Sequence, residues 1–283
     1  MEMENMGLEF NPMRSLIYVD CIKEQNRHKL KHWLYYHHVP ESIAQFGPYV
    51  SKYAFYPALP VPPEGERFGG YKMQLTEHYW MVNPMCEELN VKTLKEFFPM
   101  DVLKWQGTIP EEVSEENMLD GDSARSTGGD NGMPPFIFAF LPISWQKDIK
   151  GNGRSMEDGP NYRWQFMIKY PDGVSLEEGD KWFFEKVIPF FEKAPEVNRI
   201  LTSQVIQSVN GCPFQRTVEM WFDGPNEWYK VAVKEAAAIE KPVWATCNTF
   251  PYLKPKFEIA SLFLTDIAES DNYTQYRGFI PMR

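Results

Sequence analysis

Several features that would place a chain in a common protein class are missing from this sequence. No run of about 18 apolar residues occurs, so we expect no transmembrane helix. The first ten residues, MEMENMGLEF, lack the basic and apolar regions of a secretion signal, which favours a cytoplasmic protein. Lysine and arginine number 29 against 39 acidic residues, a net charge of −10. Binding to nucleic acid or to an anionic membrane is not expected, because phosphate binding needs clustered positive charge.

Cysteine is scarce, and no two copies form a CxxC metal or redox pair. The four are Cys21, Cys86, Cys212 and Cys247. We therefore expect reduced, mostly buried thiols. The GxGxxG fingerprint, the GxxxxGK(S/T) phosphate loop and the GxSxG elbow are also missing. Nucleotide-dependent chemistry and α/β-hydrolase chemistry thus have no support.

What is present indicates a well-buried core, since 43% of the 283 residues are hydrophobic and 15% are aromatic. The first half is predicted to alternate as β-α-β-β-α-β, which is a ferredoxin-like unit. Apolar spacing and turn residues place strands at 14–21, 51–56, 71–82 and 101–108, and helices at 26–36 and 90–98.

The second half is predicted to repeat this order. Strands are expected at 161–170, 201–208, 215–222 and 257–265, and helices at 175–193 and 226–240. Ser175 resembles an N-cap, and residues 210–211 resemble a hairpin turn. We therefore predict an α+β protein of two tandem ferredoxin-like modules, 1–148 and 149–283, whose antiparallel sheets pair as an α+β barrel.

A long polar segment separates the two halves. Residues 110–135 are acidic, rich in glycine and serine, and too polar to bury. A loop of this length in a compact protein is either functional or a solvated insertion. The residues alone leave both interpretations open.

All five histidines lie in the first 78 residues: His28, His32, His37, His38 and His78. His28 and His32, four apart on a predicted helix, have the spacing of a metal clamp but no third ligand at a zinc-protease spacing. We interpret them as exposed helix residues. His38 precedes Val39 and Pro40 at the predicted helix end, where a structural cap and a position facing a cleft are both open.

Other candidate groups are aromatic or acidic. The aromatic side chains on the predicted strands are expected to form core, although a cavity among them would suit a flat polyphenol. They are Tyr53, Phe55, Tyr56, Tyr79, Trp80 and Trp105. For the carboxylates Glu77 and Asp101, ion pairing or exposure is a simpler expectation than acid/base catalysis.

Several long runs carry a resemblance to a known family. They are NPMRSLIYVDC, HVPESIAQFGPYVSKYAFYP, RFGGYKMQLTEH, FFPMDVLKWQG, PFIFAFLPISW, LKPKFEIAS and YRGFIPMR. Together they resemble the bacterial chalcone isomerases of flavonoid-degrading anaerobes. The resemblance extends from about residue 11 to the end of the chain, and only the extreme N-terminus and residues 110–135 diverge.

The resemblance implies a barrel-forming ferredoxin-like fold, no cofactor, a homo-oligomer and a lid over the pocket. It assigns the catalytic histidine of an HxP step to His38 and the active-site glutamine of a WQG step to Gln106. A further site histidine corresponds to His78. This chain departs from the family in having Tyr79 where a second histidine is expected, and in having the extra histidine His37 beside the candidate base.

These residue types suit the isomerisation of a flavanone to a chalcone. A histidine can take the proton α to the ketone and return it near neutral pH. The amide of Gln106 can donate to the enolate oxygen as negative charge develops there. Trp105 and Tyr53 are then candidate stacking walls, and His78 and Tyr79 further substrate contacts.

Three other functions remain open from the sequence. The first is a related isomerase that acts on a flavanonol, through the same enolisation. The second is haem binding, which would need an axial histidine in the second half, where there is none. The third is a polyphenol-binding protein without catalysis, which would bind a flavanone tightly and leave it unchanged.

Overall fold

A β-α-β-β-α-β order occurs in each half of the described chain, and two short strands, at residues 148–150 and 270–271, stand outside it. The structure, a computed structural model, describes residues 13–21, 23–80, 99–106, 112, 114, 138–143, 148–151, 162–206 and 213–272. Within these ranges the strands form two five-stranded sheets, and all neighbouring strands are antiparallel. The predicted α+β class with antiparallel sheets is confirmed.

The first sheet has the strand order β10-β2-β3-β1-β4. Its strands and the helices that connect them are β1 (Met13–Val19), η2 (Glu24–Asn26), α2 (Arg27–Trp33), η3 (Leu34–His38), α3 (Val39–Phe46), η4 (Gly47–Tyr49), β2 (Val50–Pro57), η5 (Gly65–Phe68), β3 (Gln74–Trp80), α5 (Met100–Gln106) and β4 (Phe138–Ile143). The last strand, β10 (Ser270–Asp271), returns from the far end of the chain and pairs with β2.

The second sheet has the corresponding order β5-β7-β8-β6-β9. Its elements are β5 (Asp148–Lys150), β6 (Tyr162–Ile168), α7 (Leu176–Trp182), η6 (Phe183–Val187), α8 (Ile188–Lys193), β7 (Arg199–Gln204), β8 (Arg216–Phe222), α9 (Pro225–Trp228), η7 (Tyr229–Lys234), η8 (Glu235–Ala238) and β9 (Ile259–Leu264). The Ser175 hydroxyl accepts a hydrogen bond from the backbone N–H of Glu178, as its predicted N-cap role requires.

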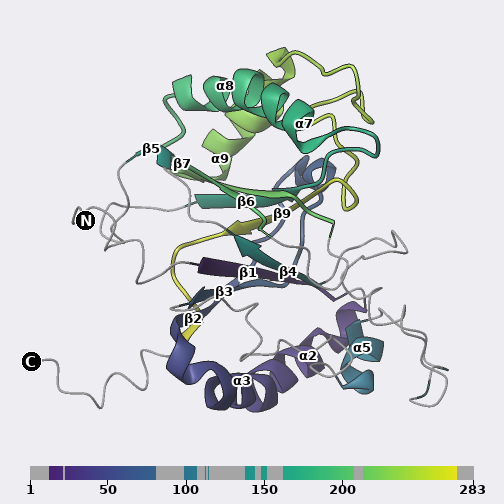
Figure 1. Cartoon of the computed structure of the whole chain (residues 1–283), viewed down its shortest axis with the longest axis vertical. Coiled ribbons are helices and arrows are strands. Elements are labelled where there is room, and N and C mark those ends of the chain that lie inside the picture. Colours follow the sequence, from purple (N-terminus) through teal and green to yellow (C-terminus); the bar gives the residue numbers. More distant parts are fainter. Residues whose placement is uncertain are drawn as a thin grey trace, which may run out of the picture.

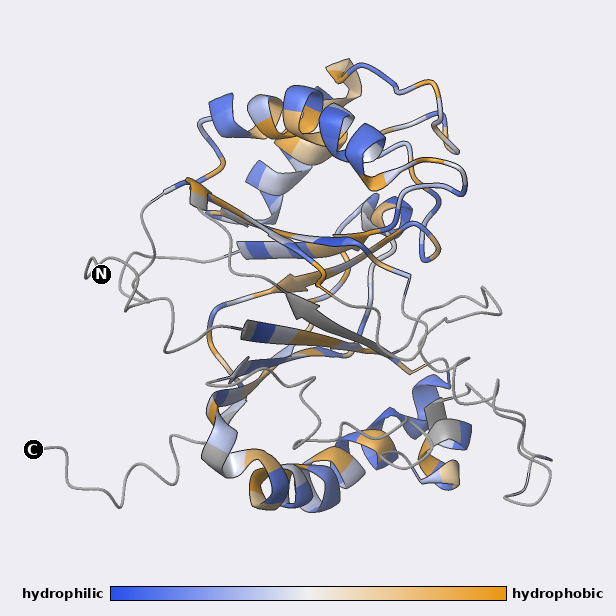
Figure 2. Ribbon diagram, viewed as in Figure 1, coloured by the Kyte–Doolittle hydropathy of each residue, from blue (hydrophilic) through white to orange (hydrophobic). Residues whose placement is uncertain are grey.

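The two sheets stack face to face, and each carries its helices on the outer side (Figure 1). Side chains alternate along a strand, so a strand that lies between the helices and the other sheet contributes to two apolar layers. On β1, Leu16 and Tyr18 pack between the sheets, whereas Ile17 and Val19 pack under α2 and α3. The helices turn hydrophobic stripes inward and hydrophilic ones outward (Figure 2). No helix in the described part of the chain is long and apolar enough to cross a membrane.

The strand predicted at 101–108 is wrong, because residues 100–106 form the helix α5. Val102 and Trp105 are three residues apart and both pack on the core of the first half, which is a helical spacing. Their β-favouring side chains suggested a strand, but packing overrides such propensity. The fourth strand of the first sheet is instead β4, and the helix predicted at 90–98 lies outside the described residues.

The helix predicted at 26–36 is found, but it does not end before Pro40 as expected. It continues through the π-helical turn η3 into α3 and ends at Phe46. Proline lacks an N–H and its ring crowds the carbonyl four residues back, so it normally interrupts a helix. Here the wider π turn directly precedes Val39 and Pro40, and the chain stays helical. His38 therefore lies within a continuous helical segment rather than at its end.

The other predicted elements agree with the structure to within a few residues, except where they reach beyond its described ranges. Of the segment 110–135, only residues 112 and 114 are described, so its proposed role as a lid stays a prediction. The turn predicted at 210–211 also lies outside the described part. Cys21 is buried and Cys247 is half-buried, and both are free thiols.

Candidate active site

Three side chains meet at the centre of the first sheet, on the face covered by α2 and α3. The strand register places Ser15 of β1 and Tyr53 of β2 directly opposite His78 of β3. Side chains at opposed positions share one face of a sheet. All three are buried, and Tyr53 packs in the apolar layer under the helices. The sheet thus places a serine, a histidine and a tyrosine side by side.

His78 is held on three sides. Its ring stacks on that of Tyr53 with centroids 4.3 Å apart and planes 28° apart. Its Nδ1 lies 3.3 Å from the Ser15 hydroxyl oxygen. The same oxygen accepts a hydrogen bond of 2.9 Å from the indole N–H of Trp80, whose ring centroid is 5.5 Å from that of His78. These contacts fix the position of the imidazole.

His38 approaches this layer from the helix above. It is the last residue of the π turn η3, where the N–H of Val39 donates to the carbonyl of Leu34, five residues back. The wider turn brings His38 over Trp33, and their rings stack with centroids 4.9 Å apart and planes 24° apart. His38 is half-buried, whereas His37 is exposed on the other side of the helix. Of the two adjacent histidines, His38 is the one that points into the protein.

Both inward histidines are neutral at pH 7. Removal from water lowers the pKa of His38 to about 4. It also lowers the pKa of His78 to about 3, with a further contribution from repulsion by His38. That repulsion means that the two imidazoles lie close enough to sense each other's charge. A neutral imidazole has one nitrogen that accepts and one that donates, so this pair offers both a base and a donor.

Trp105 and Gln106 lie on α5, which packs against α2 in the same helical layer. Trp105 is half-buried in the apolar layer of the first half, and its carbonyl accepts a hydrogen bond from the side-chain amide of Asn26. Gln106 is the last residue of α5, and its side chain lies outside the described part of the structure.

Tyr79 is not brought to this group. Because neighbouring residues of a strand point to opposite faces, Tyr79 faces the second sheet while His78 faces the helices. The cations of Arg14 and Lys52 lie 5.6 Å and 5.0 Å from the centre of the Tyr79 ring. The predicted substrate contact of Tyr79 therefore has no geometric support on the side of His38.

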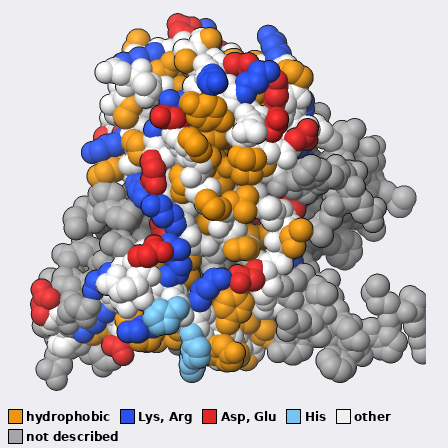
Figure 3. Space-filling model, turned by 180° about the vertical axis from the view of Figure 1, so that it is seen from behind, with side chains coloured by type: hydrophobic (Ala, Val, Ile, Leu, Met, Phe, Trp, Pro, Cys, Tyr) orange, Lys and Arg blue, Asp and Glu red, His pale blue; other side chains and the backbone are white. Residues whose placement is uncertain are grey.

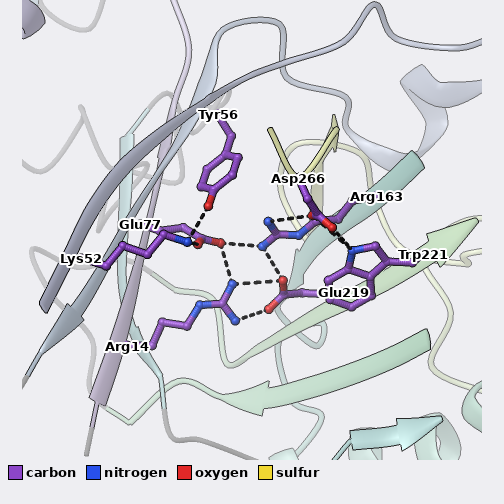
Figure 4. Close-up of polar contacts among 8 residues, drawn as sticks. All are labelled: Arg14, Lys52, Tyr56, Glu77, Arg163, Glu219, Trp221 and Asp266. Atoms are coloured by element: carbon purple, nitrogen blue, oxygen red, sulfur yellow. Dashed lines mark hydrogen bonds and ion pairs between the residues drawn. The ribbon is translucent and has the colours of Figure 1, made fainter. Parts of the chain in front are cut away.

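A closed ring of four charged side chains lies between the sheets (Figure 4). Arg14 donates to Glu77 at 2.6 Å, and Arg163 donates to Glu77 at 2.5 Å. Glu219 accepts from both arginines and completes the ring. Lys52 lies 3.5 Å from Glu77 at the rim. The ring adjoins a pocket of about 240 Å³.

The charges of this ring balance one another. Burial opposes the charge on Glu77, but Arg14 and Arg163 outweigh it and hold the pKa of Glu77 well below its usual range. Glu219 is affected in the same way. Both carboxylates are therefore ionised and paired rather than available as acids or bases. The expectation of ion pairing for Glu77 is confirmed.

The second half carries apolar side chains at the positions equivalent to Ser15 and His78. In both halves the central strand pair carries an arginine and a glutamate at matching register positions, Arg14 with Glu77 and Arg163 with Glu219. Between them, the paired Ser15 and His78 of the first half correspond to Trp164 and Met220. The space between sheet and helices around Trp164 is filled, with a cavity of only about 10 Å³. The described polar site therefore belongs to the first half alone.

The remaining histidines lie on the surface. His28, His32 and His37 are exposed, as expected for the first two. Figure 3 shows histidine side chains at the end of the molecule that α2 and α3 form. The rings of His32 and Tyr36 stack there with centroids 4.6 Å apart. Among the described residues, no group of three or more histidine, cysteine or acidic side chains is placed to hold a metal ion.

Sequence reasoning missed the role of Ser15, and it assigned Trp80 and Trp33 no part in the site. A small hydroxyl residue inside the apolar strand SLIYV was the available signal, since such a side chain needs a buried partner. Only the register reveals that this partner is His78.

Residues 10–111 match the family model described as the chalcone isomerase N-terminal domain. The matched range includes His38, Tyr53, His78 and Gln106, and it spans less than half of the chain. The match supports a chalcone isomerase-like family. No curated protein matches the sequence.

Two solved structures illustrate the similarity at the level of the whole chain. An anthrone oxidase-like protein shares 10% identity at a TM-score of 0.47, over 93% of this chain and 94% of that one. Chlorite dismutase from Candidatus Nitrospira defluvii shares 7% identity at a TM-score of 0.39, over 92% of each chain. These likenesses are too distant to carry an argument about function.

Proposed function

We propose that this protein is a cofactor-free chalcone isomerase that interconverts a 2′-hydroxychalcone and a flavanone, with His38 as the acid/base. The observation that carries the proposal is a half-buried His38, stacked on Trp33 in the helical segment that covers the sheet face holding Ser15, Tyr53 and His78, in the part of the chain that matches the family model. His38 is neutral at pH 7 and partly accessible, so it is able to accept a proton from a bound molecule.

The reaction balances without any further reactant. His38 takes the proton from the carbon α to the ketone, and the enolate expels the phenolate oxygen by β-elimination as the ring C–O bond breaks. The phenolate then takes up the proton. In the reverse direction, His38 takes the phenol proton, the phenolate adds to the enone, and His38 gives that proton to the α carbon of the enolate. A positioned general base contributes about 10²- to 10⁴-fold to such a step.

The other residues have supporting roles in this proposal. Gln106 donates to the enolate oxygen, where negative charge develops in the transition state. Trp105 and Tyr53 form aromatic walls, and His78 contacts the substrate. The residues 110–135 close over the bound flavonoid, and the enzyme is a cytoplasmic homo-oligomer built from two ferredoxin-like modules, 1–148 and 149–283.

The direct test is absorbance near the chalcone band, without added cofactor. Purified protein is mixed separately with naringenin, with its 2′-hydroxychalcone and with a dihydroflavonol. We expect the first two to reach one common equilibrium mixture. Turnover of the dihydroflavonol alone would identify a flavanonol isomerase instead. Binding without turnover of all three would identify a polyphenol-binding protein.

Two neighbouring histidines provide a matched pair of variants. His38→Ala should lower kcat by about 10²-fold or more, whereas His37→Ala, an exposed residue on the same turn, should leave turnover within about twofold. Circular dichroism of both variants checks that the helix is intact. Normal turnover by a folded His38→Ala protein would exclude His38 as the base.

A further inference from the structure

Ser15 is a buried hydroxyl residue between two ring systems of the candidate active site. Its side chain is fully buried in the middle of β1. Among the described contacts, its oxygen has two partners, the indole nitrogen of Trp80 at 2.9 Å and Nδ1 of His78 at 3.3 Å. The direction of these two hydrogen bonds decides which nitrogen of His78 carries the proton.

Trp80 determines that direction. An indole N–H can only donate, so the Ser15 oxygen must be the acceptor in the first bond. The Ser15 hydroxyl then has one proton of its own to donate. If His78 Nδ1 also donated to Ser15, the described contacts would offer this buried proton no acceptor, which costs about 1–3 kcal/mol. If Ser15 donates to Nδ1, the indole proton and the hydroxyl proton both have acceptors. The imidazole proton then lies on Nε2, which is not one of the buried side-chain nitrogens without a partner in the described part of the chain.

We infer that Ser15 is a positioning residue, which Trp80 orients and which holds His78 as the tautomer with its proton on Nε2. His78 then keeps one fixed role, as a neutral hydrogen-bond donor from Nε2, while His38 exchanges the proton of the reaction. This inference rests on the proposed function for its catalytic consequence, but the tautomer itself is a property of the free protein.

The electrostatics of the site agree with this division. Desolvation and the charge of His38 hold the pKa of His78 at about 3, so His78 stays neutral when His38 becomes protonated. A neutral donor at a developing oxyanion stabilises it without a competing protonation step. The hydrogen bond from Ser15 to Nδ1 keeps the imidazole proton on Nε2, so Nε2 donates rather than accepts.

The second half contains a matched serine–tryptophan pair without a histidine. Trp164 Nε1 donates to the Ser261 oxygen at 3.2 Å, and the Ser261 hydroxyl donates to the carbonyl of Phe68 at 2.7 Å. There the serine hydroxyl donates to a backbone carbonyl. In the first half the serine hydroxyl donates to the imidazole of His78, so Ser15 connects the Trp80 indole to a titratable ring.

The test reads the tautomer directly, in protein labelled with ¹⁵N-histidine and without substrate. Long-range proton–nitrogen correlation spectra distinguish protonated from unprotonated ring nitrogens. The signals of His78 are those lost in His78→Gln. We expect wild-type His78 to show unprotonated Nδ1 and protonated Nε2, Ser15→Ala to shift both signals toward a mixture of tautomers, and Ser261→Ala to leave them unchanged.

Kinetics provide the second readout. Ser15→Ala should lower kcat about tenfold to a hundredfold with little change in KM, and should leave the pH midpoint of His38 in place. If Ser15→Ala does not fold, Trp80→Phe removes the orienting donor while keeping a ring, and should shift the same signals.

A protonated Nδ1 in the wild type would overturn the inference, as would unaltered His78 signals in folded Ser15→Ala. Failure of the proposed function can be told apart from failure of this inference. If the protein turns over no flavonoid, the nitrogen spectra of the substrate-free protein still show which tautomer His78 adopts.

Discussion

His38 and Val187 occupy equivalent places in the two halves of the chain. Each is the last residue of a π-helical turn, and each stands two residues before a proline, Pro40 or Pro189. Val187 is buried in the apolar layer of the second half, whereas His38 is half-buried beside His78. The first half therefore carries a titratable ring at a position that the second half uses for packing, and π turns recur at functional sites.

The pH dependence of isomerisation should follow His38. A histidine works as a base only when neutral, and its pKa here is about 4 rather than the ordinary 6.5. We expect kcat/KM for ring opening of the flavanone, the direction in which His38 is the base, to be flat from about pH 6 to 8 and to fall with a midpoint near 4. Stopped-flow assays after brief exposure to each pH measure this profile. A midpoint near 6.5 would show that His38 is not desolvated in the free enzyme.

Two tyrosines on neighbouring strands, Tyr53 on β2 and Tyr79 on β3, should respond differently to the same substitution. Tyr53 stacks on His78, so Tyr53→Leu should lower kcat/KM for naringenin by about tenfold through lost stacking and a loosened imidazole. Tyr79 faces the second sheet, so Tyr79→Leu should change kcat/KM by less than about twofold. Steady-state kinetics on folded variants provide the comparison. Equal losses in both would contradict a substrate position on the His78 face, and a loss in Tyr79→Leu alone would place substrate on the other face of the sheet.

The buried ring of charges should govern acid stability. Glu77→Gln removes one carboxylate from two buried arginines and should lower the unfolding free energy by about 3–5 kcal/mol. Glu66 forms an exposed pair with Lys72, so Glu66→Gln should cost less than about 1 kcal/mol. Urea unfolding of the three proteins at pH 7 measures both differences.

The same ring predicts the sign of the pH effect. Glu77 has a folded-state pKa below its unfolded value of about 4.3, so its contribution is complete above that pH and is lost as pH falls toward the folded pKa. The wild type should therefore lose stability below about pH 4.3, and Glu77→Gln should lose less over the same window. A steeper acid loss in the variant would contradict the assignment.

Gly69 should be intolerant of any side chain. Its φ is +70°, and a Cβ there would lie 2.2 Å from the carbonyl oxygen of Ile259 in the second half. Gly69→Ala should therefore destabilise the protein by about 3 kcal/mol or more, through strain and clash together. Gly173 also has a positive φ, +88°, but no atom within 4 Å, so Gly173→Ala should cost about 1 kcal/mol. Thermal unfolding of the two variants separates clash from backbone strain.

The sequence alone predicted the α+β class, most strands and helices, and a site in the first half. Alternation and helical spacing are local, and all five histidines lie within the first 78 residues. It misplaced the fourth strand, because Val102 and Trp105 favour strands yet pack as one face of α5. It also ended a helix before Pro40, since the π turn that accommodates this proline depends on packing.

Only the tertiary structure decided which residues share a site. Strand register places Ser15 and Tyr53 against His78 and turns the adjacent Tyr79 toward the second sheet. The helix above directs His38 inward and leaves His37 in solvent. Such relationships depend on which strands pair and on how a helix lies on the sheet. Both are set by contacts between distant parts of the chain, and spacing along the sequence carries little information about them.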